Sequence, residues 1–389
     1  MHNMILFLLF MFTFFPFVSL FPIATDTQPI APLLSVIFIV LCFINGLAKK
    51  WHAFVILYTM TFCLYINPFG VGDIYFNKIF ALLTAVLLYV SYSLCSKETD
   101  VIYSTIKVTI VVYLAFSIFT MMFPSAGLSI QSLLVRNVNS VEFGYRGIST
   151  FSTEPGLFSG VILALYAIAN AISYKFTNRE LFFISFSVLF LLAASRSGTA
   201  IAMLVIYLFF KFFNVKTMVS FSIVCLAIYT TIIFNMDFFD TFLRENFGRL
   251  GSILFIVITD PERILSDSSI FYRIYALYVG LLIFLENPLG VGFGDVKVLS
   301  DIVVSEHGTL SSFYADSKFG FRAVSSLGYY ISALGIFFIC PMVYLFMKSK
   351  APLENKALAF SMISFSYSIA FPLIWLLLAL DNKPTNEVK

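Results

Sequence analysis

Residues 189–204 read LFLLAASRSGTAIAML, two apolar segments that meet at a short turn carrying Arg196. An ionised side chain at membrane depth costs about 2.5–3.5 kcal/mol, so an arginine in such a position has a structural or functional reason. Its neighbours are alanine, serine, glycine and threonine, and these small residues leave space around the guanidinium, as an anion pocket requires. The alternative is an interfacial arginine whose head group reaches water. The stretch predicts two apolar helices joined at Arg196.

The composition of the whole chain agrees with this interpretation. Of its 389 residues, 60% are hydrophobic and 12% are charged, and the mean hydropathy is +0.95. Soluble domains are about half apolar and a quarter charged. We therefore expect an all-α polytopic integral membrane protein, with residues 1–389 in a single bundle. The cysteines lie singly in apolar runs, so no metal or other cofactor is predicted, and no basic and aromatic segment indicates nucleic acid.

Membrane spans can be placed by length, because a helix needs about 20 mostly apolar residues to cross a bilayer. A further apolar run, 271–285, is short, and it predicts either a re-entrant or interfacial helix or a twelfth span. Lysines in short loops favour the cytoplasm and place the N-terminus inside. The C-terminal tail is then outside with eleven spans and inside with twelve. The eleven segments are 4–23, 30–48, 52–66, 76–95, 101–123, 155–174, 180–195, 197–213, 217–236, 323–347 and 356–380.

Arginine and lysine separate along this topology. With eleven spans, two long loops, 124–154 and 237–322, lie on the outer face together with the Arg196 turn. Of nine arginines, eight fall in these outer segments and only Arg179 lies inside. Arginine binds phosphate and carboxylate groups through a planar fork, which lysine lacks. The outer arginines therefore predict an anion-binding surface, with surface ion pairing as the alternative for Arg244, Arg249 and Arg263, which have acids close in sequence.

Residues 145–160, YRGISTFSTEPGLFSG, place Arg146 and Glu154 where an apolar segment begins. An acid followed by proline is typical of a helix N-terminus, so Glu154 could serve as an ordinary cap. The functional alternative is a carboxylate held near Arg146, which would act as a general base or orient a sugar hydroxyl.

The third motif begins at Arg273 and ends in NPLGVGFG, residues 287–294. A G-x-G-x-G without a preceding strand is weak evidence for nucleotide binding, and no GK[ST] is present to form a P-loop. Alone, it predicts a turn at which the backbone approaches a ligand or another helix. His307 follows in the same loop and could titrate near neutral pH.

Together, R-G-x-x-x-F-x-x-E-P at residues 146–155, S-R-S-G at 195–198 and an arginine followed by N-P-L-G-V-G-F-G resemble the bacterial Wzy-type O-antigen polymerases, which are related to O-antigen ligases. The resemblance covers most of the chain by architecture and some forty residues by motif. Ligases tend to have a His-Asn pair after the large outer loop; here Arg322 and the residues after it stand in that place, which favours a polymerase. The R-x10-G pattern of some polymerases fits once, from Arg136 to Gly147.

The resemblance implies a metal-independent, GT-C-like lipid-carrier glycosyltransferase of the bacterial inner membrane, with its active site facing the periplasm. The donor would be a glycan on undecaprenyl diphosphate, transferred to the next lipid-linked repeat unit. Possible partners are the membrane lipid and a chain-length regulator. We expect Arg196 and Arg273 at the diphosphate, Arg146 with Glu154 at the acceptor, and Arg136, His307 and Arg322 as further substrate-binding residues. The rivals are an O-antigen ligase and a non-enzymatic flippase or transporter of lipid-linked oligosaccharide.

Overall fold

The structure is a computed structural model that describes residues 2–19, 28–66, 73–135, 147–212, 234–247, 268–306, 325–365 and 367–381, with short pieces between 220 and 260. The regular elements of these residues are helices. Strand-like pairing within them is limited to an isolated antiparallel bridge between Val18 and Val135. The all-α prediction is confirmed for the described part of the chain.

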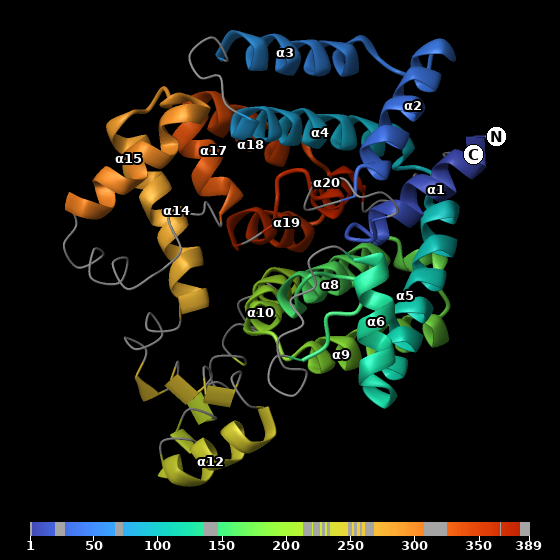
Figure 1. Cartoon of the computed structure of the whole chain (residues 1–389). Helices are drawn as coiled ribbons and strands as arrows, with labels where there is room; N and C mark the ends of the chain where they lie inside the picture. The colour runs from blue at the N-terminus through green and yellow to red at the C-terminus, as the bar shows by residue number, and fades with distance from the viewer. Residues whose placement is uncertain are drawn as a thin grey trace.

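Helices of the first half of the chain form two neighbouring groups (Figure 1). Their starts follow from the sequence: Thr177 and Glu180 form a capping box at α9, and the Ser197 hydroxyl accepts from the Ala200 amide at the start of α10. In chain order the helices are α1 (His2–Phe14), α2 (Ile30–Ile44), α3 (Lys50–Ile66), α4 (Asp73–Cys95), α5 (Thr99–Met122), α6 (Pro124–Leu134), α8 (Pro155–Ala171), the 3-10 turn η2 (Ser173–Lys175), α9 (Asn178–Ser195) and α10 (Gly198–Lys211).

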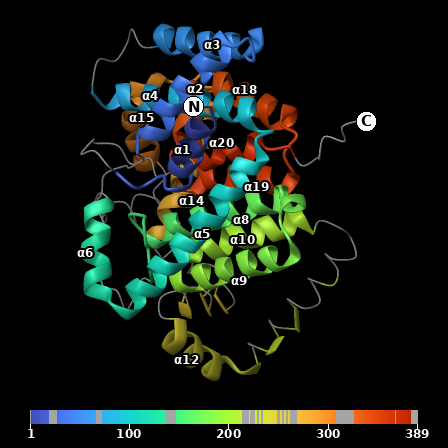
Figure 2. The same cartoon turned by 90° about the vertical axis from the view of Figure 1, so that its right-hand side faces the viewer.

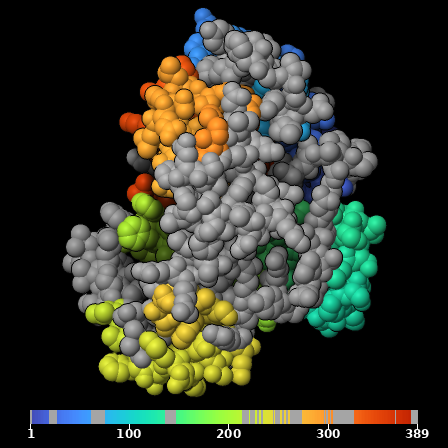
Figure 3. Space-filling model, turned by 60° about the vertical axis from the view of Figure 1, so that its left-hand side comes forward, coloured from blue at the N-terminus to red at the C-terminus, as the bar shows by residue number. Residues whose placement is uncertain are grey.

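The second half adds helices on both sides of this assembly. Figure 2 shows α12 at the opposite end of the molecule from α3. Figure 3 shows α15 and α6 on one face of the molecule. The second-half helices are α12 (Met236–Phe247), α14 (Ser268–Glu286), α15 (Gly292–Glu306), α17 (Ser326–Leu334), α18 (Ile336–Lys348), α19 (Leu353–Phe365) and α20 (Pro372–Ala379). The predicted outer loops 124–154 and 237–322 therefore contain helices of their own.

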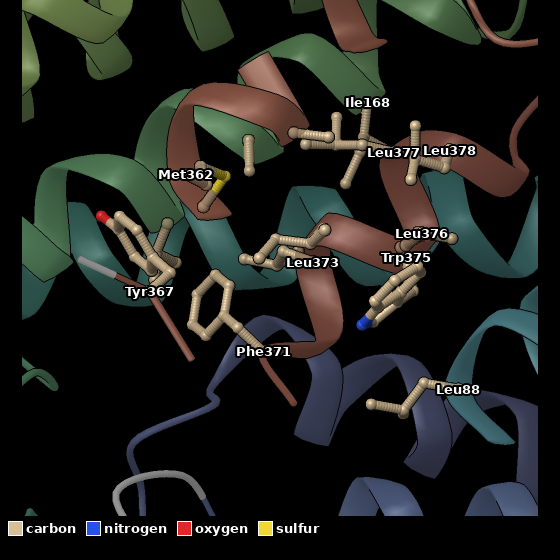
Figure 4. Packing of buried hydrophobic residues seen from close by; sticks show 14 of the residues in the cluster. Leu88, Ile168, Met362, Tyr367, Phe371, Leu373, Trp375, Leu376, Leu377 and Leu378 are labelled. Carbon is tan, nitrogen blue, oxygen red and sulfur yellow. The ribbon is translucent and has the colours of Figure 1, made fainter. Parts of the chain in front are cut away.

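The centre of the core is formed by α8 and α20. Both helices are buried nearly all round, α8 from Phe158 onward and α20 from Pro372 to Leu378. Figure 4 shows Ile168 of α8 beside Leu377 of α20. A helix that is apolar on every side is found inside a large core or a membrane. The N-terminus of α8 carries Glu154, one of the predicted site residues.

Among the described residues, three helices are long and apolar enough to cross a membrane: Phe76–Cys95 within α4, Thr99–Met122 and Asn178–Ser195. Their outer faces are apolar too, since Phe182, Phe186 and Leu189 of α9 form a stripe in which each side chain is at least 60% exposed. Such contiguous exposed apolar surface is rare on soluble monomers, and lipid solvates it. The described chain is thus compatible with a membrane protein. The expected number of spans is not confirmed, because further apolar helices such as α10, with 14 residues, are shorter.

Two predicted continuous spans are divided, which corrects the sequence-based placement. Segment 323–347 breaks at Gly335, whose φ of 55° and ψ of −133° end α17 and start α18. Segment 356–380 breaks between α19 and α20, where Pro372 stands at the start of the new helix. Hydropathy missed both breaks because the apolar residues on either side keep the average over a span-length window high. The described residues of the second break, Tyr367 to Phe371, include Tyr367, Ile369 and Phe371, each at most 1% exposed.

Candidate functional site

The structure describes Glu154, Arg196 and Arg273, three of the residues predicted for the site. The other four, Arg136, Arg146, His307 and Arg322, lie outside the described residues. The described three belong to different elements: the N-cap of α8, the turn between α9 and α10, and the first half of α14.

Glu154 precedes α8 with an extended backbone, at φ −152° and ψ 155°, and Pro155 follows as the first helical residue. The Glu154 side chain makes no capping hydrogen bond to the helix. Glu154 is therefore the N-cap residue of α8, as the capping alternative predicts, but its side chain does not hydrogen-bond to the helix. The carboxylate of a half-buried residue is left at the helix start without the local backbone partner that the cap would supply.

Arg196 closes α9 in a left-handed conformation, at φ 45° and ψ 38°. One residue later, Ser197 begins α10. The side chain of Arg196 is exposed, so the structure places it at the edge of the helix pair rather than between the two helices. Arg196 is therefore exposed at this turn, while Ser197 and Thr199, at the start of α10, are half-buried.

The three motifs meet around Gly156. A Cβ atom added at Gly156 would lie 3.6 Å from Ser197 Oγ, 3.7 Å from Thr199 Oγ1 and 3.8 Å from Arg273 Nη2. Arg273 also donates a hydrogen bond from Nη1 to Thr199 Oγ1, at 2.5 Å. Residues from α8, the start of α10 and α14, which span more than a hundred positions of the sequence, therefore lie around one point. Neither hydropathy nor spacing predicts this contact.

A second contact joins the R-G motif to the Arg196 turn. Gly147 has φ 81°, and a Cβ at this position would collide with the carbonyl of Ser195. The next residue, Ile148, donates its amide to the Ala194 carbonyl at 3.0 Å. Only glycine permits this approach in this conformation. The segment that begins at Gly147 is therefore fixed to the end of α9, next to Arg196.

The electrostatics at the meeting point favour an anion. Gly156 and Thr199 both lie in the first turn of a helix, and each helix N-terminus carries roughly half a positive charge. The guanidinium of Arg273 adds a full charge and a planar fork for phosphate or carboxylate oxygens. Two helix N-termini and an arginine thus converge, while the Glu154 carboxylate lies beside them.

Backbone strain is concentrated in the same two motifs. Among the described residues, Thr150 at φ 42° and Arg196 at φ 45° are the non-glycine residues with positive φ. Thr150 is β-branched and fully buried, and its hydroxyl has no hydrogen-bond partner in the described part of the chain. Such conformations cost of order 1–3 kcal/mol each and cluster at functional sites.

Three contributors were missed by sequence reasoning. Gln131 of α6 is buried and donates to Ser149 Oγ at 2.7 Å and to the Ser152 carbonyl at 2.8 Å, which fixes the serine-rich turn before Glu154. Thr199 was treated only as a small neighbour of Arg196. Tyr367 lies in the break before α20, and the serines and proline around it were the available signal for that break.

The glycine-rich stretch after Arg273 has a structural role. Gly290, at φ 87°, lies against the backbone of Ala333 and Leu334. The Val291 amide donates to the Ser332 carbonyl at 3.0 Å. The interpretation of this stretch as a turn that approaches another helix is confirmed, since it docks on the break between α17 and α18. At the crossing of α14 and α17, Gly280 faces Gly328 backbone to backbone, which holds the helix that carries Arg273.

The described residues contain no group of three or more His, Cys, Asp or Glu side chains that could hold a metal ion. Comparisons with family models, with curated proteins and with solved structures found no match. The functional argument therefore rests on the residues of this chain.

Proposed function

We propose that this protein is a lipid-linked oligosaccharide glycosyltransferase of the O-antigen polymerase type. It would transfer a growing glycan from undecaprenyl diphosphate to the next undecaprenyl-diphosphate-linked repeat unit, at the periplasmic face of a bacterial inner membrane. The observation that carries the proposal is the convergence of Arg273, the first turn of α8 and the first turn of α10 around Gly156. This is a cradle for an anion on a protein with apolar outer faces.

A lipid diphosphate suits these features better than a free anion. Its polyprenyl tail would lie along exposed apolar helices such as α9, and its phosphates would reach the helix ends. Helix N-termini and arginine forks are the donors that bind phosphate oxygens most readily. Arg196, exposed beside the cradle, supplies a second guanidinium.

In the proposed reaction, a hydroxyl oxygen of the acceptor sugar attacks the anomeric carbon of the donor. The bond from that carbon to the diphosphate oxygen breaks, and the electron pair stays on the diphosphate. Arg273 and Arg196 stabilise this developing charge, which is the kind of contribution that lowers a barrier most. Glu154 accepts the hydroxyl proton or orients the hydroxyl, and Arg146 would act together with it. Arg136, His307 and Arg322 would bind the glycan.

A flippase or transporter of lipid-linked sugar is the second candidate, and the divided helices favour it. Helices that break at membrane depth form substrate sites in many transporters. The breaks here are filled by buried side chains such as Ile369 and Phe371, which supports an anchoring role for them instead. An O-antigen ligase would use the same donor and the same arginines with lipid A-core as acceptor.

The test is reconstitution of the purified protein in liposomes with the undecaprenyl-diphosphate-linked repeat unit of its host, without nucleotide sugar. A ladder of products spaced by one repeat unit is expected. Transfer that requires added lipid A-core would instead indicate a ligase. Movement of the lipid-linked unit across the bilayer without any new glycosidic bond would indicate transport. Both outcomes contradict the polymerase.

A further inference from the structure

We infer that Tyr367 is a positioning residue that fixes the first turn of α8, and with it Glu154, against Arg273. The inference rests on the proposed function, because the purpose of this placement is the transfer reaction. Its physical basis is a hydroxyl group that reaches from the break between α19 and α20 into the site.

The hydrogen bonds of Tyr367 define the link. Its hydroxyl lies 2.9 Å from the Gly156 carbonyl and 3.1 Å from the Leu157 carbonyl, so its single proton is donated to one or the other. Figure 4 shows the hydroxyl pointing away from Phe371 and toward α8. Gly156 is the residue around which Ser197, Thr199 and Arg273 gather. A tyrosine more than 200 positions away thus holds the turn that completes the anion cradle.

The fit between Tyr367 and α8 is specific. A Cβ atom at Gly160, one turn after Gly156, would collide with the Tyr367 hydroxyl. Glycine at this position inside a buried helix costs up to about 1 kcal/mol relative to alanine. The space that Gly160 leaves is filled by the phenol group, so close contact of Tyr367 with α8 accounts for a glycine that helix propensity disfavours.

Tyr367 itself is held rigidly. It is 1% exposed, its amide donates to the Met362 carbonyl at 3.1 Å, and its ring packs on Phe371 with centroids 4.8 Å apart. A buried anchor whose hydroxyl reaches the first turn of α8 is what a positioning residue requires.

The matched substitutions are Tyr367→Phe and Tyr330→Phe. Tyr330 is likewise buried, and its hydroxyl donates to a backbone carbonyl, that of Lys78, at 2.8 Å. Both variants keep the ring and lose one hydrogen bond, but only Tyr367 reaches α8. A third variant, Gly160→Ala, leaves Tyr367 intact and pushes its hydroxyl away from the same carbonyls.

Two measurements separate positioning from simple core stability, both on folded protein in liposomes. In steady-state kinetics with the lipid-linked repeat unit, Tyr367→Phe and Gly160→Ala should each lower kcat about tenfold. This is the expected effect of one lost hydrogen bond on the reacting geometry, and KM should stay within about twofold of the wild-type value. Hydrogen exchange should be faster at Gly160 and Val161, whose amides face the Gly156 and Leu157 carbonyls in an α-helix. Tyr330→Phe should leave both unchanged.

The outcomes distinguish this inference from the proposed function. The inference is overturned if folded Tyr367→Phe has the wild-type kcat and unchanged hydrogen exchange at Gly160 and Val161. That outcome leaves the proposed polymerase function in place. If the wild-type protein makes no ladder, the polymerase fails, and hydrogen exchange alone decides whether Tyr367 fixes α8. Equal effects of Tyr367→Phe and Tyr330→Phe on kcat would also overturn the inference about Tyr367, because the loss of kcat would then follow from a weakened core in general.

Discussion

The two ends of α8 hold cations in different ways. At the C-terminal end, Lys211 donates to Asn170 Oδ1 at 3.1 Å and lies over the rings of Tyr166 and Tyr207. At the N-terminal end, roughly 21 Å away at 1.5 Å per residue, Arg273 donates to Thr199 between two helix N-termini. The lysine is placed among neutral and aromatic groups, and the arginine is placed where positive potential accumulates.

This difference indicates which end has a function beyond topology. Lysines near the C-terminal end also form exposed ion pairs, such as Lys175 with Asp100 at 2.8 Å, and the hydrogen bond that Lys175 donates to Asp100 raises the pKa of the Lys175 ammonium. Exposed pairs of this kind contribute little to stability. The N-terminal end instead gathers an arginine and two helix N-termini beside Glu154, and it is the end at which we propose that an anion binds.

The largest expected effect comes from Arg273. Replacing Arg273 by Met should lower the rate of transfer by roughly 10²–10³-fold, since the leaving diphosphate loses a preorganised donor. Replacing it by Lys should restore the charge but not the fork, and recover only part of the rate. The measurement is product formation per folded protein in liposomes. The control is Arg179→Lys at the other end of the bundle, and an equal loss there would remove the distinction between the ends.

Arg196→Gly should separate stability from activity. Glycine adopts the left-handed conformation of residue 196 without strain, so the variant should gain about 1 kcal/mol of stability. The transfer rate should nevertheless fall roughly thirtyfold, the loss of one charged contact to the diphosphate. Thermal unfolding and product ladders measure the two effects. Arg196→Lys, which keeps the charge and the strained backbone, should show no gain in stability. A variant that is stabilised and fully active would mean that Arg196 serves only the turn.

Thr199→Val tests the contact between α10 and α14. Valine has the shape of threonine but cannot accept the hydrogen bond from Arg273, and the transfer rate should fall about tenfold. The Arg273→Lys/Thr199→Val double variant should be no slower than Arg273→Lys alone, because Thr199 acts through Arg273. The control is Thr105→Val in α5, where the hydroxyl donates to Val101 of its own helix. Additive losses would show that Thr199 acts by another route.

The smallest effect on the transfer rate is expected at the C-terminal end of α8, where Lys211 lies. Lys211→Met removes the ammonium among the aromatic rings, a contact of about 0.5–1 kcal/mol where exposed, and should change the transfer rate by less than about twofold. The same kinetic assay measures this. A loss as large as that of Thr199→Val would mean that both ends of α8 take part in the reaction.

Sequence reasoning identified the helical architecture and the three motifs, because apolar periodicity and isolated charges are local properties. It also selected Glu154, Arg196 and Arg273, and it placed Arg196 in a turn between two helices and Glu154 at a helix start, as the structure has them. It missed the division of segments 323–347 and 356–380. A break depends on what fills the gap. Gly335 adopts its positive φ because it has no Cβ, and it packs on the Pro288 turn, a contact distant in sequence.

By itself, the sequence determined that this is an apolar helical chain, since composition and hydrophobic periodicity require no knowledge of contacts. The separation of arginines from lysines across a membrane stays a prediction. Only the tertiary structure decided that Arg273 meets Thr199 and Gly156, and that Tyr367 reaches the first turn of α8. These contacts join residues from four parts of the chain. They depend on how closely helices approach one another, and that distance is set by the glycines and side-chain volumes at each crossing, which a one-dimensional pattern does not contain.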